Sequence, residues 1–215
     1  MAHTKRIEAV QVIWSCILRI TDSTPEAVVM TNYITAAEIA NCTTRPKVAP
    51  ILAALDQDVL RDIFQDRVRA GEARLLAGEY LYALYDAYRT IIGRAVHLTM
   101  VGRDAGKVPA WYEDQHVISL MSNIFTPDEM AQFRALDLAQ LTWFRTNIER
   151  KFVERAELIA TGQESALTAV AQARAIEAAA SRLEPKAASV EALPDQAGNG
   201  GETNRGVVSQ HRKNR

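Results

Sequence analysis

Apolar residues recur at intervals of three and four positions along most of this 215-residue chain. That spacing places them on one face of an α-helix, whereas a half-buried strand needs strict alternation of apolar and polar residues. The first helical stripe consists of Ile7, Val10, Trp14, Ile17 and Leu18. No alternating segment is long enough to support a sheet. The sequence therefore predicts an all-α fold, an irregular bundle of about six helices.

Prolines, glycines and capping residues divide this pattern into separate helices. Helices are expected over residues 4–22, 26–41, 51–71, 111–124 and 130–160, with a charged interior loop at 101–110. A further helix is expected to begin after Gly71, with its apolar inner face over 81–92. The clearest start signal is Thr126-Pro-Asp-Glu129. In such a capping box the threonine oxygen accepts a backbone N–H bond and the glutamate bonds back to the threonine N–H. A long helix is therefore expected directly after Thr126.

Composition divides the chain into three parts. Residues 4–161 carry the aromatic and branched side chains of the predicted helical bundle. Residues 164–184 are rich in alanine with a thin apolar face, which predicts a helix that projects from the bundle or docks on a partner. Residues 185–215 have no aromatic residue and more basic than acidic side chains, which is typical of a disordered basic tail.

The overall charge and the cysteines limit where this chain acts. Its formal net charge is −1, so any contact with nucleic acid or an anionic membrane has to be local. Cys16 and Cys42 are the only cysteines, and we expect free buried thiols in a reducing compartment. No stretch approaches the roughly 20 apolar residues that span a membrane, and no secretory signal is evident. We therefore expect a cytoplasmic protein without membrane insertion.

Residues 34–55 resemble helix-turn-helix DNA-binding segments, in which a short helix leads into a recognition helix in the major groove. The resemblance implies that DNA would be contacted by Thr43, Thr44, Arg45 and Lys47. No acidic residue lies between Glu38 and Asp56, so the segment is locally positive. The competing interpretation is a pair of packed helices joined by a proline-rich corner, because Pro50 would interrupt the recognition helix.

Two further motifs are candidate ligand sites. Gly102-Arg-Asp-Ala-Gly-Lys107 is one residue too short between its glycines for a phosphate-binding loop, and a connector is the favoured interpretation. Glu113 and His116 have the spacing of two metal ligands on one helical face, but the sequence contains no second such pair. We therefore expect no metal and no cofactor.

Asp137 falls where the apolar stripe of the helix predicted over 130–160 would place a hydrophobic residue. A buried carboxylate must be paired, so Asp137 is a candidate buried polar site, for instance with Arg134. The alternative is a stripe that shifts to Leu136 and leaves Asp137 at its edge.

Three classes of function remain open. The first is a non-enzymatic interaction or scaffold protein that binds another protein through its C-terminal helix and tail, because catalytic motifs are lacking. The second is a helix-turn-helix regulator that uses residues 34–55. The third is an enzyme without a recognisable motif, whose catalytic residues the sequence does not identify.

Overall fold

The computed structural model of this chain describes residues 2–161 and 166–181. Within these residues every regular element is a helix and no strand is present, so the predicted all-α bundle is confirmed. The predicted tail, residues 185–215, lies outside the described residues. No helix of the described part is long and apolar enough to cross a membrane.

The α-helices range in length from four to 26 residues. In chain order the elements are α1 (Ala2–Asp22), α2 (Glu26–Val29), η1 (Met30–Asn32), α3 (Ala36–Ala40), η2 (Cys42–Thr44), α4 (Ala49–Ala53), α5 (Gln57–Phe64), α6 (Arg67–Ala77), α7 (Glu79–Asp104), η3 (Trp111–Glu113), α8 (Gln115–Ile124), α9 (Pro127–Arg134), α10 (Gln140–Ala160) and α11 (Ala166–Ser181). The three elements labelled η are single 3-10 turns.

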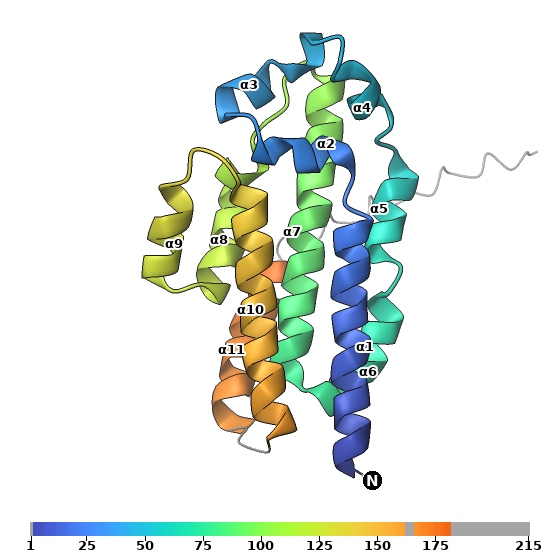
Figure 1. The fold of residues 1–215 in the computed structure, drawn as a ribbon, viewed down its shortest axis with the longest axis vertical. Helices are drawn as coiled ribbons and strands as arrows, with labels where there is room; N and C mark the ends of the chain where they lie inside the picture. Colours follow the sequence, from blue (N-terminus) through green and yellow to red (C-terminus); the bar gives the residue numbers. More distant parts are fainter. Residues whose placement is uncertain (1, 162–165, 182–215) are drawn as a thin grey trace, which may run out of the picture. The chain divides into compact units, whose positions relative to one another are not determined.

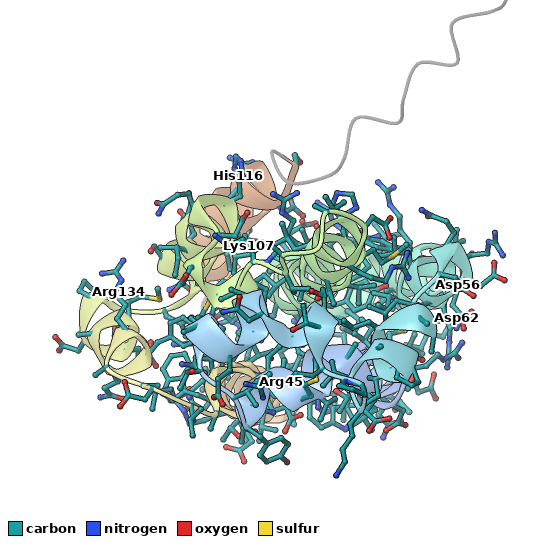
Figure 2. All side chains as sticks on the ribbon, turned by 90° about the horizontal axis from the view of Figure 1, so that it is seen from above. Arg45, Asp56, Asp62, Lys107, His116 and Arg134 are labelled. Carbon is teal, nitrogen blue, oxygen red and sulfur yellow. The ribbon has the colours of Figure 1, made fainter. Side chains whose placement is uncertain are left out.

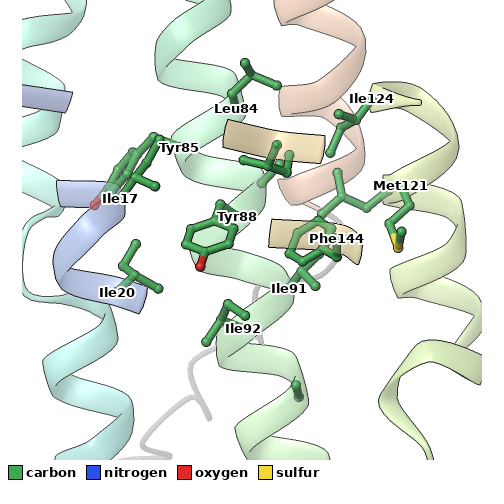
Figure 3. Packing of buried hydrophobic residues seen from close by; sticks show 14 of the residues in the cluster. Ile17, Ile20, Leu84, Tyr85, Tyr88, Ile91, Ile92, Met121, Ile124 and Phe144 are labelled. Carbon is green, nitrogen blue, oxygen red and sulfur yellow. The ribbon is translucent and has the colours of Figure 1, made fainter. Parts of the chain in front are cut away.

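Helix α7 is the centre of the bundle. Helices α1, α5, α6, α10 and α11 all contact it (Figure 1). Sixteen of its 26 residues are buried, so it is covered on nearly every side, as a helix that is apolar all round must be. Figure 3 shows Tyr88 of α7 between Ile20 of α1 and Phe144 of α10. The Tyr88 hydroxyl lies 2.7 Å from the Thr21 hydroxyl, which satisfies a polar group inside the core.

The helix expected over 26–41 is divided. It consists of α2, the turn η1 and α3, because Thr35 starts a new helix with its own capping box to Glu38. The helix expected over 51–71 is also divided, because the Asp56 side chain caps α5 by accepting the N–H groups of Asp58 and Val59. Both divisions follow from local capping residues that the apolar stripe alone does not reveal.

A contact between distant segments divides the helix expected over 130–160. Ala139 has a positive φ of 65°, a backbone conformation that is unfavourable for any residue other than glycine. The Asn32 backbone oxygen accepts the Ala139 N–H at 3.0 Å, and its side-chain oxygen accepts the Thr142 N–H at 3.0 Å. Asn32 therefore supplies the cap of α10 from more than a hundred residues away.

The last described helix, α11, packs on the bundle. It contacts α7 and α8, and Glu177 forms an ion pair of 2.9 Å with Arg74 of α6. Its buried side chains are Ala173, Ile176, Ala179 and Ala180. The predicted projection from the bundle is therefore wrong for the described part of this helix. Its small alanines let it approach α7 closely, so even a thin apolar face can be covered by the chain itself.

The predicted capping box at Thr126 is confirmed, and it joins α9 to α10. Glu129 accepts the Thr126 N–H at 2.8 Å and pairs with Arg150 at 2.5 Å and Lys151 at 3.0 Å. Partial burial alone would raise the pKa of the Glu129 carboxyl. The Thr126 N–H and the two cations outweigh that effect and lower the pKa to about 2.

The Phe64 ring of α5 packs against Gly93 and Arg89 of α7. A Cβ at Gly93 would lie 2.6 Å from two ring atoms of Phe64, so the ring occupies the space that the glycine leaves. The buried Arg89 guanidinium lies 4.8 Å from the centre of the same ring and pairs with Asp86 at 2.5 Å. The ring thus packs between a glycine and a cation, which fixes the position of α5.

We expect acid to destabilise the fold partly through Glu129. Because its folded pKa lies below its ordinary value of 4.5, its contribution is present above pH 4.5 and is lost as the pH falls toward 2. Glu129→Gln should remove about 1–3 kcal/mol of the stability lost between neutral and acid pH. Denaturant unfolding at several pH values measures this loss. Glu72→Gln, at an exposed site on α6, should keep the pH dependence of the parent; an unchanged slope in Glu129→Gln would contradict the assignment.

We expect Gly93→Ala to destabilise the protein by about 1–3 kcal/mol, because the added methyl displaces the Phe64 ring. Gly71→Ala is the matched control, since a Cβ at Gly71 in α6 meets no atom within 4 Å. That control should gain up to about 1 kcal/mol from helix propensity. Thermal or denaturant unfolding compares the two variants. Equal effects of the two substitutions on stability would show that the packing of the Phe64 ring does not require a glycine at position 93.

Candidate functional site

An apolar groove lies on the surface between α1 and α10. Its volume is about 320 Å³. The residues that line it are Ile7, Val10, Gln11, Trp14, Phe152, Val153, Ala156, Glu157, Ile159 and Ala160. They come from the N-terminal half of α1 and the C-terminal half of α10, which flank α7 in the lower part of Figure 1. We call this feature the α1/α10 groove.

Two contacts join α1 and α10 in or next to the groove. The Trp14 and Phe152 rings pack with their centres 5.2 Å apart. Near the C-terminal end of α1, the Arg145 guanidinium donates to the Thr21 carbonyl oxygen at 3.4 Å. The groove lies on the N-terminal side of the Arg145 contact along α1, so its apolar lining ends where polar contacts join the two helices.

The lining of the groove is apolar, and its polar residues lie at the rim. Gln11 and Glu157 are its only polar lining residues, and both are exposed at the rim. Val153 keeps 45% of its surface exposed, although it is a branched apolar residue. Apolar surface of this kind, bordered by polar residues, marks sites of protein contact in soluble proteins. The lining offers no pair of groups for proton transfer or nucleophilic attack.

A buried polar cluster lies where α5 and α6 meet α1 and α7. Asp66 is 7% exposed and its carboxylate lies 3.0 Å from Nε of Arg19. Burial, followed by the nearby Asp66 charge, raises the pKa of the Cys16 thiol, so it stays protonated and a poor nucleophile. Burial also raises the pKa of the Tyr85 hydroxyl. The Asp66–Arg19 ion pair ties the junction of α5 and α6 to α1, and the Cys16 thiol and Tyr85 hydroxyl stay protonated at neutral pH.

The two cysteines are free and buried, as predicted. Neither contributes to a metal centre: within the described residues no group of three or more histidine, cysteine, aspartate or glutamate side chains is placed to hold a metal ion. Glu113 and His116 are both exposed, so their helical spacing does not produce a site with enclosed ligands.

The glycines of the predicted connector end α7 instead of holding a ligand. Helix α7 continues to Asp104, so the first residues expected in the loop are helical. A Cβ at Gly102 would lie 2.5 Å from the Val108 Cα, and Gly106 has a φ of 75°. The Lys107 N–H bonds back to the Gly102 oxygen at 2.9 Å. Both glycines are therefore required by the reversal of the chain at the helix end.

The segment compared with helix-turn-helix proteins forms two five-residue helices, α3 and α4, separated by the turn η2. Thr43 donates to the Gly106 oxygen at 2.8 Å, and Thr44 donates to the Asn41 oxygen at 3.0 Å. Both hydroxyls are thus used inside the chain. Pro50 lies in the first turn of α4, where its missing N–H costs nothing.

The two basic residues of that segment differ in their surroundings. The Arg45 guanidinium lies 3.5 Å from the Glu38 carboxylate, and Lys47 is exposed in the turn before α4. Figure 2 looks onto this end of the bundle and shows Arg45 and Lys107 at separate places. Arg45 lies directly after η2 and Lys47 lies in the following turn, so neither cation is on a helix.

Asp137 is exposed in the turn between α9 and α10. The predicted buried polar site at Asp137 is therefore wrong. The reason is the division of the long helix at Ala139: the stripe on which the prediction rested does not continue through residue 137. Neither interpretation of the stripe anticipated this break.

Comparison with protein-family models, curated proteins and solved structures gives no match for this chain. The sequence alone does not reveal the groove. The apolar face of α1 is visible there, but which part of it stays uncovered depends on the place where α10 packs.

The DNA-binding hypothesis stays a prediction. It requires duplex DNA to bind with an affinity that falls steeply with salt, and it requires Arg45→Ala and Lys47→Ala to weaken binding about uniformly across sequences. Arg134→Ala, which removes an exposed cation from α9 (Figure 2), is the control and should leave binding unchanged. Fluorescence anisotropy with a labelled duplex measures the affinities. Binding that ignores both substitutions would exclude this segment as the contact.

Proposed function

We propose that this chain is a non-enzymatic interaction protein that docks the apolar side of a helix in the α1/α10 groove. The single observation that carries the proposal is the apolar groove of about 320 Å³ between Ile7–Trp14 on α1 and Phe152–Ala160 on α10, in which Val153 stays 45% exposed. An amphipathic helix that lays its apolar face into such a groove is a recurrent form of protein recognition. The two buried thiols support a cytoplasmic setting as part of this proposal.

The length of the groove limits what it accommodates. Ile7 and Trp14 are two helical turns apart, which corresponds to about 10.5 Å. A docked helix would therefore contact the groove through apolar residues at positions i, i+3 or i+4, and i+7. Glu157 at the rim favours basic rather than acidic residues beside that stripe.

This proposal moves the expected partner contact away from the C-terminal helix. The buried apolar residues of α11, which lie within Ala173–Ala180, are covered by α7 and α8, so they are not free to receive a partner. The described surface offers the α1/α10 groove in its place. A contribution of the tail stays a prediction, since residues 185–215 lie outside the described part of the chain.

The test introduces a photo-cross-linking amino acid at Val153 in cells that produce this protein. We expect cross-links to a defined protein, and the same residue placed at exposed Ser122 on α8 should not give them. The purified partner should then lose at least about tenfold in affinity for Val153→Asp. Leu158→Asp is the matched control, since Leu158 is 38% exposed on α10 but does not line the groove. Equal losses for the two substitutions would contradict the proposal.

A further inference from the structure

Helix α6 presents an apolar stripe that nothing in the described part of the chain covers. Leu75 is 89% exposed and Val68 is 73% exposed. They are seven residues apart and therefore lie on the same side of the helix, with Gly71 between them. We call these three residues the α6 stripe. Scattered single apolar residues are ordinary on a protein surface, whereas Val68 and Leu75 share one face of a helix.

The α6 stripe has the length that the α1/α10 groove accepts. Val68 and Leu75 are two helical turns apart, as are Ile7 and Trp14 of the groove. Large residues at both ends with a glycine between them let the backbone of α6 approach the groove closely.

The stripe cannot fill the groove of its own chain. Helix α1 meets α6 through Lys5, Glu8, Ala9 and Val12, which line a second cleft with Arg69 and Leu76. The groove uses another side of α1, the side that carries Ile7, Val10 and Trp14. Helices α6 and α10 therefore flank α1 on different sides, so a stripe that enters the groove has to come from another molecule.

The charges of the two surfaces are complementary. Helix α6 carries three arginines and one glutamate, and one of these arginines, Arg74, is paired with Glu79 and Glu177 inside the chain. The groove contains no basic residue, its rim carries Glu157, and it extends to Ala160 at the C-terminal end of α10. The carbonyl end of a helix is electronegative and favours nearby cations. A basic helix is therefore a better occupant of this groove than an acidic one.

We propose that the α6 stripe of one copy of this chain docks in the α1/α10 groove of a second copy. This inference rests on the proposed function, because it names the helix that the groove receives. The two surfaces differ, so the contact is heterologous: each docked copy still offers one free stripe and one free groove. Such a contact produces open chains, or rings where the rotation closes. The small contact gives weak assembly, on the order of tens of micromolar.

The experiment measures the mass of the full-length protein by sedimentation velocity, from about 1 µM to about 300 µM. We expect the average mass of the parent to rise beyond that of a dimer. Leu75→Asp removes the stripe and Val153→Asp blocks the groove, and each variant alone should stay monomeric. Both side chains are exposed, so the fold should survive, which circular dichroism and thermal unfolding check. Leu158→Asp should assemble like the parent.

The decisive step mixes the two monomeric variants. Leu75→Asp keeps an intact groove and Val153→Asp keeps an intact stripe, so an equimolar mixture should form a dimer and nothing larger. Assembly of either single variant at the level of the parent, or a mixture that stays monomeric while the parent assembles, would overturn the inference.

The two proposals fail in different ways. A parent that stays monomeric over the whole range overturns self-assembly. If a partner captured at Val153 still binds in purified form and is lost with Val153→Asp, the groove keeps its proposed function with another occupant. If neither assembly nor such a partner is found, both proposals are contradicted.

Discussion

The burial of α7 on nearly all sides is the constraint on which the rest of the structure depends. A helix of 26 residues with 16 of them buried needs neighbours around its whole circumference, and α1, α5, α6, α10 and α11 provide them. Polar groups along α7 are tolerated only because they have partners in the core, as Arg89 has in Asp86 and Phe64. The positions of the surrounding helices therefore follow from the need to cover the apolar surface of α7.

This arrangement explains why uncovered apolar surface remains on the outside. Helices α1 and α10 each turn one face to the core, and the groove opens beside those faces, where neither helix covers the other. Helix α6 likewise buries three alanines, Ala70, Ala73 and Ala77, while Val68 and Leu75 stay exposed. Packing around one central helix thus uses the inner faces and leaves single apolar side chains exposed on the outer faces, among them Val68, Leu75 and Val153.

Local signals in the sequence predicted part of this fold, and distant contacts set the remainder. The capping box at Thr126 is encoded within four residues and was found at the expected position. The break before α10 depends on Asn32, a residue far away along the chain, so no helical pattern around Asp137 reveals it. The extent of α6 differs from the prediction because Gly71, the predicted helix end, lies inside that helix. The α1/α10 groove could not be predicted from the sequence for the same reason, since the exposure of its side chains depends on how α10 packs against α1.

The most direct test of the central claim is a dilution series followed by NMR of the isotope-labelled methyl groups of valine and leucine. We predict concentration-dependent shifts at Val153 in the groove and at Leu75 on α6, with Leu158 unchanged although all three are exposed. These shifts would show that groove and stripe enter contacts at the same protein concentration. Shifts at Leu158 equal to those at Val153, or no shift at Val153 and Leu75 at any concentration, would contradict a specific contact between the two surfaces.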